Sequence, residues 1–261
     1  MGKVIAVTNQ KGGVGKTTTS VNLAAGLSYL GAKVLLIDLD PQGNASQGAG
    51  VGNNHKKKST YDLLLGDESV EEIVIKLKKP PFDIIPSTID LAGADLEMAE
   101  FKTGREQYLK RKLDIMKHQY DFVIIDCPPS LGLLNTNALT AADSVMIPVQ
   151  CEYYALEGLT QLLSTIRLVQ RLFNHDLKIE GVLLTMFDVR TKLSVEVQQE
   201  VRKYFKEKVY RTCIPRNVKL SEAPSTGQTI FEYDINSSGA KAYAALAKEV
   251  LQHSKGEKGD A

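Results

Sequence analysis

The sequence contains no tryptophan and only three cysteines among its 261 residues, and its charges almost cancel. The cysteines, Cys127, Cys151 and Cys213, are too few and too widely spaced for a disulfide framework or a CxxC metal site. We therefore expect buried, reduced thiols. The net charge of +1 excludes a uniformly basic protein, so any binding to nucleic acid must use a local patch.

Long apolar runs are also missing. A membrane-spanning helix needs roughly 18 consecutive apolar residues, and no segment of the chain approaches this length. The first residues lack the order of charged, apolar and small residues that marks a signal peptide, and segment 252–261 has no apolar stripe. Without a linker-rich segment or an internal repeat, we expect a cytoplasmic protein with one domain over 1–253 and a polar, flexible tail over 254–261.

Short apolar segments alternate with longer helical patterns along the chain. The predicted strands are 3–8, 33–38, 82–87, 120–126, 144–150, 181–187 and 211–215. Most are apolar throughout, which is typical of parallel strands that are covered on both faces. The alternation predicts an α/β fold with a doubly wound, mostly parallel sheet of seven to eight strands, helices on both faces, and ligands at the carboxyl ends of the strands.

Helical periodicity is clearest over 16–30, 156–173 and 193–208. The second of these segments forms one apolar stripe, which we interpret as a core-facing surface. The residues of the stripe are Leu156, Leu159, Leu162, Leu163, Ile166, Val169 and Phe173. The longest predicted loop is 47–59, and its run of three lysines is interpreted as a solvated surface.

The segment NQKGGVGKTTTS, residues 9–20, follows the first predicted strand and resembles a phosphate-binding loop. The standard pattern G-x-x-x-x-G-K-[ST] requires glycine at position 10, where the chain has Gln10. In addition, Lys11 precedes the expected Lys16. The predicted ATP-binding residues of this loop are Lys11, Gly12, Gly13, Val14, Gly15, Lys16, Thr17 and Thr18.

Each group of this loop has a chemical reason to be there. The glycines let backbone N–H groups approach the phosphates, and the N-terminus of the helix over 16–30 faces the same anion. Lys16 is expected to reach the β- and γ-phosphates, the Thr17 hydroxyl to bind Mg²⁺, and Thr18 to contact the α-phosphate. Gly31 is well placed to end the helix.

Carboxylates follow two of the predicted strands. Asp38 and Asp40 lie in IDLDPQGN, and Asp126 follows four apolar residues in the position of a Walker-B acid. Mg²⁺ keeps several waters and binds few protein oxygens, so we predict Thr17, Asp40 and Asp126 as its ligands, directly or through water. Asp40 is also expected to orient the attacking water.

The additional lysine has a physical motive. Negative charge accumulates at the bridging oxygen during phosphoryl transfer, and a cation beyond Lys16 would stabilise it. We therefore predict Lys11, Lys16 and Asp40 as catalytic residues. The spacing alone leaves open whether Lys11 acts on the nucleotide of its own chain or on that of a partner.

Six segments carry a resemblance to a known family. They are KGGVGKTT, DLDPQGNAS, IIDCPPSLG, PVQCEYYALEGL, LLTMFDVRT and IPRNVKLSEAPS. The chain resembles the ParA/Soj partition ATPases, which have the deviant Walker A loop of the ParA/MinD group. The resemblance implies a homodimer that sandwiches two ATP molecules, with Lys11 contacting the partner's ATP. It also implies that Pro215 and Asn217 lie at the adenine, with Asp40 and Asp126 in two switch regions.

The same resemblance implies ATP-dependent, sequence-independent DNA binding, association with the nucleoid, and slow hydrolysis that a ParB-like centromere-binding protein stimulates. Within 178–219, ten Lys or Arg stand against five Asp or Glu, a local excess that suits phosphate contacts. Arg190, Arg216 and Lys219 are the predicted DNA contacts, although Arg216 has a second interpretation as a nucleotide contact. The family often has arginine where this chain has Lys219, and lysine keeps the charge without the bidentate geometry.

Two alternatives share the predicted ATP site. A MinD-like, membrane-acting ATPase would need a C-terminal amphipathic helix, which segment 252–261 does not supply. A metabolic enzyme of the same class would need converging cysteines for an iron cluster or an acceptor pocket, and Cys127 is interpreted as a small core residue. Because the sequence begins directly on its first strand, we expect it to lack the N-terminal DNA-binding domain of larger plasmid ParA proteins.

Overall fold

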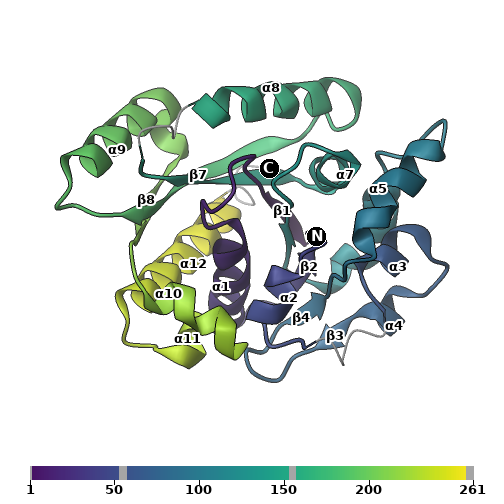
Figure 1. The fold of residues 1–261 in the computed structure, drawn as a ribbon, viewed down its shortest axis with the longest axis horizontal. Helices are drawn as coiled ribbons and strands as arrows, with labels where there is room; N and C mark the ends of the chain where they lie inside the picture. The colour runs from purple at the N-terminus through teal and green to yellow at the C-terminus, as the bar shows by residue number, and fades with distance from the viewer. Residues whose placement is uncertain (1, 53–57, 153–156, 257–261) are drawn as a thin grey trace.

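The computed structural model describes residues 2–52, 58–152 and 157–256, and these residues form an α/β fold around one eight-stranded sheet (Figure 1). The strand order is β3-β4-β2-β5-β1-β6-β7-β8. The strands are β1 (Lys3–Val7), β2 (Val34–Asp38), β3 (Ile75–Lys76), β4 (Asp83–Ile85), β5 (Phe122–Asp126), β6 (Ser144–Gln150), β7 (Lys178–Phe187) and β8 (Val209–Pro215). All neighbouring pairs are parallel except the edge pair β3–β4, so the predicted fold class is confirmed.

All seven predicted strands are present; the strand predicted over 144–150 has the same ends as β6, and the other six differ at one end or both. The strand predicted over 82–87 is reduced to the three residues of β4, and Pro86, which has no N–H to donate to a ladder, follows it directly. The strands predicted over 181–187 and 211–215 begin earlier, at Lys178 and Val209. The two-residue edge strand β3 was not predicted, because so short a segment carries no periodic pattern.

The helices cover both faces of the sheet. They are α1 (Lys16–Tyr29), α2 (Asn44–Gly48), α3 (Thr60–Leu65), α4 (Val70–Ile73), α5 (Leu91–Glu100), α6 (Tyr108–Met116), α7 (Leu133–Ala141), α8 (Glu157–Leu172), α9 (Lys192–Phe205), α10 (Lys219–Glu222), α11 (Ile230–Tyr233) and α12 (Ser238–Gly256). In Figure 1, α1 and α12 lie side by side. Their close packing depends on Gly26, where an added Cβ would lie 2.9 Å from the Cβ of Ala247.

Alternate residues of the strands feed two separate cores. On β1, Val4 and Ala6 pack into the core that contains α3 and α5 to α9, whereas Ile5 and Val7 pack against α1, α2 and α12. Both sets are fully buried, as expected for a sheet covered on both faces. This arrangement leaves the strand ends as the places where polar side chains can gather.

The helical predictions are largely confirmed. On α8, Leu159, Leu162, Leu163, Ile166 and Val169 are buried in the core, while Leu156 lies outside the described residues. Phe173 is partly buried against the same core. Helix α9 ends at Phe205, before the predicted end at 208, because Lys206 takes a φ of 51° that a helix cannot contain.

Two predicted boundaries fall on or near residues outside the description. Helix α12 continues to Gly256, so it includes residues 254–256, which were expected to begin the tail. The predicted loop 47–59 begins inside α2 and ends at Ser59, which caps α3, while 53–57 are not described. Among the described residues, no helix is long and apolar enough to cross a membrane.

Candidate functional site

The loop between β1 and α1 has the backbone that a phosphate-binding loop needs. Gly13 and Gly15 take φ values of 73° and 86°, in the left-handed region where a side chain would be strained. An added Cβ at Gly12 or Gly13 would meet nothing within 4 Å, so a ligand can approach this backbone closely. The Thr185 hydroxyl on β7 donates a 2.8 Å hydrogen bond to the carbonyl of Val14 and holds the loop in place.

This loop forms one wall of a cavity of about 640 Å³ at the carboxyl ends of the strands. The lining residues from the loop are Gly12, Gly13, Gly15, Lys16, Thr17 and Thr18. Asp40 lines the same cavity. A second cavity of about 360 Å³ is lined by Pro215, Arg216 and Asn217 and shares Gly15 and Thr18 with the first. The two cavities are therefore adjacent, as a site for phosphates and a site for a base would be.

Lys16 is the cation of the first cavity. Its side chain is buried, and its Nζ donates a 3.1 Å hydrogen bond to the carbonyl of Lys11. Burial lowers the pKa of the Lys16 ammonium, while the charges of Asp126 and Asp40 oppose that shift. A buried ammonium that faces an open cavity is stabilised by an anion, so Lys16 is suited to bind phosphate oxygens.

Two carboxylates meet beside the loop. Asp38 and Asp126 end the neighbouring strands β2 and β5 in register, and both are fully buried. Asp126 accepts hydrogen bonds of 2.8 Å from the hydroxyls of Thr17 and Ser20. Burial, and then the charge of Asp38, raise the pKa of Asp126. The structure thus brings the predicted metal residues Thr17 and Asp126 together, in surroundings that favour a neutralising cation.

The oxygen ligands here fit a hard cation that takes most of its other ligands from water and from the substrate phosphates. Within the described part of the chain, no group of three or more His, Cys, Asp or Glu side chains could hold a metal ion. One hydroxyl and nearby carboxylates suit Mg²⁺, which is usually bound through one or two protein groups together with water and substrate phosphates.

Asp38 organises the loop that carries Asp40. Its carboxylate accepts hydrogen bonds from the N–H of Asp40 (3.2 Å), the N–H of Ser46 (2.7 Å) and the hydroxyl of Ser46 (2.6 Å). The Ser46 oxygen in turn accepts a 3.0 Å hydrogen bond from the N–H of Ser87, beyond β4. Ser46 therefore links the Asp40 loop to the rest of the sheet. The sequence prediction missed this residue, although it lies in the segment DLDPQGNAS.

Replacing Ser46 with alanine is expected to lower the kcat of ATP hydrolysis by about ten- to a hundredfold, because a loosely held Asp40 misplaces the attacking group. The KM for MgATP should change by less than about threefold, since Ser46 does not line the cavity. Steady-state kinetics of Ser28→Ala provides the control, because the buried Ser28 hydroxyl also donates a short hydrogen bond, of 2.7 Å, to the carbonyl of Pro81, away from the cavity lining. Equal losses of kcat in both variants would contradict a positioning role.

The predicted site residues are not all directed at these cavities. Lys11 is half-buried near the start of the loop and lines neither of the two cavities. The sequence prediction missed several lining residues, among them Met186 and Pro224. Met186 has a φ of 50°, an uncommon conformation for a residue with a side chain. Both stand in the segments LLTMFDVRT and IPRNVKLSEAPS, so those segments were the available signal.

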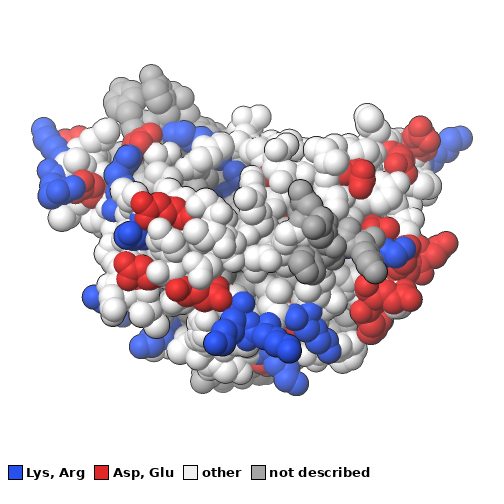
Figure 2. Space-filling model, turned by 60° about the horizontal axis from the view of Figure 1, so that its bottom comes forward, with Lys and Arg blue, Asp and Glu red and all other residues white. Residues whose placement is uncertain are grey.

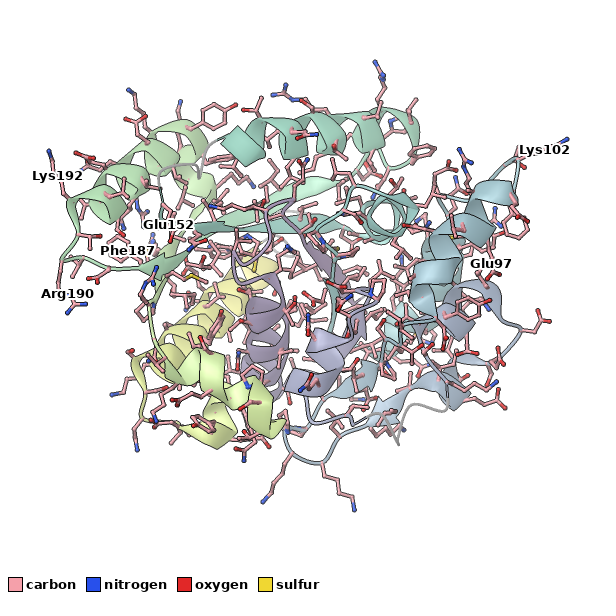
Figure 3. The ribbon with its side chains drawn as sticks, in the orientation of Figure 1. Glu97, Lys102, Glu152, Phe187, Arg190 and Lys192 are labelled. Carbon is pink, nitrogen blue, oxygen red and sulfur yellow. The ribbon has the colours of Figure 1, made fainter. Side chains whose placement is uncertain are left out.

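The three predicted DNA contacts each form an ion pair within the chain. Arg190 pairs with Asp188 at 2.8 Å, and its guanidinium makes two hydrogen bonds to that carboxylate. Arg216 pairs with Glu152 and Lys219 with Glu222, both at 3.3 Å. Figure 3 shows Arg190 and Lys192 pointing outward at one end of the molecule, far from Glu97 and Lys102.

The cysteines give no sign of a metal or redox centre. All three are free, and Cys127 and Cys151 are buried as predicted, whereas Cys213 is only partly buried. Burial raises the pKa of the Cys127 thiol, as expected for an inert core residue beside Asp126.

Solved structures share this fold. Cobyrinic acid a,c-diamide synthase from Mycobacterium smegmatis, with bound ADP and magnesium, is 40% identical, with a TM-score of 0.85 and coverage of 98% of this chain and 96% of that one. The septum site-determining protein MinD from Pyrococcus horikoshii, complexed with Mg-ADP, is 26% identical, with a TM-score of 0.79 and 96% coverage of both chains. Fold and loop together define this chain as a P-loop ATPase.

A protein-family model described as an AAA domain matches residues 2–179. The chain is 60% identical to the sporulation initiation inhibitor protein Soj of Bacillus subtilis, over 96% of this chain and 98% of that protein. It therefore belongs to the Soj/ParA family of chromosome-partitioning ATPases, as the sequence motifs predicted. The chromosome partitioning protein ParA of Myxococcus xanthus is 50% identical, over 97% of this chain and 89% of that protein.

Proposed function

We propose that this chain is an ATP-driven switch that dimerises around ATP, binds DNA without sequence preference as a dimer, and resets by slow hydrolysis to drive DNA partition. The position of Lys11 is the observation that carries the proposal. Lys16 lines the phosphate cavity of its own chain, whereas Lys11, whose carbonyl accepts a hydrogen bond from Lys16, is not among the lining residues. A second chain facing this loop would bring its own Lys11 to the phosphates, as the family resemblance implies.

The residues of the cavity support MgATP as the ligand. Lys16 and the N–H groups of the glycine loop bind the phosphates, and the Pro215 and Asn217 cavity takes the adenine. The Thr17 hydroxyl binds Mg²⁺, with Asp126 and Asp40 acting directly or through water. An Mg²⁺ ion held by these residues would neutralise the charge that develops on the transferred phosphoryl group. Asp40 orients the attacking water, and the Asp38–Ser46 bonds hold the Asp40 loop while it does so.

The trans lysine makes hydrolysis depend on pairing. In a monomer the cavity contains one cation, and in the sandwich a second cation from the partner reaches the developing charge. Because each chain completes the other's site, ATP stabilises the pair and its hydrolysis releases the pair. The conformational state, rather than the released ADP, is then the product that matters.

To bind DNA, the predicted contact residues must give up their ion pairs with carboxylates of this chain. Arg190, Arg216 and Lys219 must exchange their carboxylates for phosphates, and pairing of two chains would raise the local density of these cations. The exchange also provides a reason for weak binding by the monomer. A ParB-like centromere-binding protein is the proposed stimulator of hydrolysis, and the ATP-bound form is expected on the nucleoid.

The degree of similarity favours DNA over the alternatives. The chain is 60% identical to Soj and 50% to ParA, against 26% to the MinD structure and 40% to the synthase. Binding to lipid vesicles and turnover of a small-molecule acceptor remain the direct tests of those two alternatives.

Replacing Arg190 with glutamate is expected to weaken ATP-dependent DNA binding by about tenfold or more at low salt, because it sets a negative charge against the phosphates. ATP-dependent dimerisation, measured by light scattering, should survive. The control is Arg171→Glu, which reverses an exposed charge on α8 and should leave DNA binding nearly unchanged. If the Arg190 variant failed to dimerise as well, its role would be structural instead.

A further inference from the structure

Four lysines gather at the edge of the sheet opposite the nucleotide cavity. Lys33 directly precedes β2, Lys76 ends β3, and Lys78 and Lys79 lie in the turn between β3 and β4; we call these four the edge lysines. All four are exposed. Lys33 and Lys76 also line one groove of about 630 Å³. Figure 2, which brings the lower edge of Figure 1 forward, shows Lys and Arg side chains gathered there.

The edge lysines differ from the predicted DNA contacts in their pairing. In the described parts of the chain, no ion pair joins an edge lysine to a carboxylate, whereas Arg190, Arg216 and Lys219 all have acidic partners. Two carboxylates near the edge already accept other hydrogen bonds. Asp83 accepts one of 2.8 Å from the Tyr120 hydroxyl, and Asp121 accepts one of 2.8 Å from the backbone N–H of Lys33. An incoming anion would therefore meet unpaired ammonium groups.

The surroundings limit what that anion can be. The turn offers no large apolar side chain for insertion into a bilayer, because Leu77 and Phe82 both pack against the core and only the small Pro81 is exposed. Acidic residues flank the edge lysines on one side, as Figure 2 shows, and those around α4 are Asp67, Glu68, Glu71 and Glu72. A narrow row of lysines beside a repelling surface suits a thin polyanion such as the sugar-phosphate backbone.

The edge lysines are also independent of the nucleotide site. They lie at the amino ends of β2 and β4, whereas the cavity lies at the carboxyl ends of the strands. The five residues of β2 separate the two places by roughly 13 Å of rigid strand. Two chains that pair through their nucleotide cavities would leave both sets of edge lysines uncovered.

We propose that the edge lysines form a second DNA-contact surface, which binds the phosphate backbone without reading sequence and does so in every nucleotide state. This inference rests on the proposed function, because it takes DNA as the partner. The surface would give a released, ADP-bound chain a weak hold on DNA. It would also let a dimer bind two duplexes at once, one through the predicted DNA contacts and another through the edge lysines.

The test uses the full chain with Lys76, Lys78 and Lys79 all changed to glutamine, and measures binding to a non-specific duplex with ADP and Mg²⁺. At about 50 mM salt, affinity should fall about tenfold or more, and the slope of log K against log salt should decrease by about 0.9 per lost phosphate contact. The matched control changes three exposed lysines away from the edge and from segment 178–219, Lys102, Lys241 and Lys248, to glutamine. Because it removes the same charge without removing a cluster, it should change affinity by less than about threefold.

Three outcomes would overturn the inference. One is equal binding by the edge variant and wild type in ADP. Another is an equal loss in the edge variant and the control variant, which would indicate only overall charge. A third is unchanged DNA binding with lost binding to anionic lipid vesicles, which would identify a membrane partner. A failure of the proposed function would give a different result. Wild type would then bind DNA no more tightly with ATP than with ADP, while the affinity measured with ADP would still test the edge lysines.

Discussion

Lys16→Ala is expected to abolish ATP binding and hydrolysis. The buried Lys16 ammonium lines the phosphate cavity. Without it, the β- and γ-phosphates would face the carboxylates of Asp126 and Asp40 with no lysine to balance their charge. Loss of a single charge-stabilising donor lowers kcat by about 10²- to 10³-fold, and here weaker ground-state binding is added. Fluorescent-nucleotide titration and phosphate release measure the two effects separately.

The matched control for that experiment is another lysine of the same loop. Lys11→Ala removes the same chemical group five residues earlier, outside the cavity lining, so it should bind ATP with nearly wild-type affinity. ATP affinity that is normal in the Lys16 variant would contradict its assignment to the phosphates.

Lys11→Ala has the second large expected effect, which falls on pairing. Without the trans cation, the ATP-bound chains lose the contact that joins each to its partner's phosphates. A cation supplied in trans raises phosphoryl-transfer rates by about 10³- to 10⁵-fold in related chemistry, so hydrolysis should fall by at least about a hundredfold. Light scattering with and without ATP measures the pairing.

The contrast between the two variants is the informative result. Lys11→Ala should bind ATP and remain monomeric, whereas Lys16→Ala should fail at binding. If the Lys11 variant dimerised normally with ATP, the lysine would act within its own chain or have no catalytic role. Mixing it with a hydrolysis-deficient but Lys11-intact chain should restore one of the two sites in a mixed dimer.

Local patterns explain how much of this protein could be predicted from its sequence. The phosphate loop, its helix and the buried strands depend on residues that are adjacent in the chain, and their apolar runs and glycines mark them directly. The edge strand β3 was missed because two residues carry no period. Helix α9 was predicted three residues too long because the positive φ of Lys206 has no sequence signature.

Contacts between distant segments could not be predicted in the same way. Glu152 and Arg216 are 64 positions apart, and only the fold reveals that they pair. Likewise Lys33 is separated from Lys76, Lys78 and Lys79 by more than forty positions, so counting charge along the sequence did not find the edge lysines. The Asp38–Ser46 bond is closer in sequence, but its role depends on Ser87, which lies in the segment after β4 and donates to the Ser46 oxygen.

The most direct test of the switch is the affinity of wild type and Asp40→Ala for a non-specific duplex, with ATP, ADP and no nucleotide, at two salt concentrations. We expect ATP to strengthen binding by about tenfold or more over ADP, and we expect this gain to weaken steeply with salt. In Asp40→Ala the gain should last longer, because hydrolysis is slower. Equal affinity in all three nucleotide states, in both proteins, would contradict an ATP-driven DNA switch.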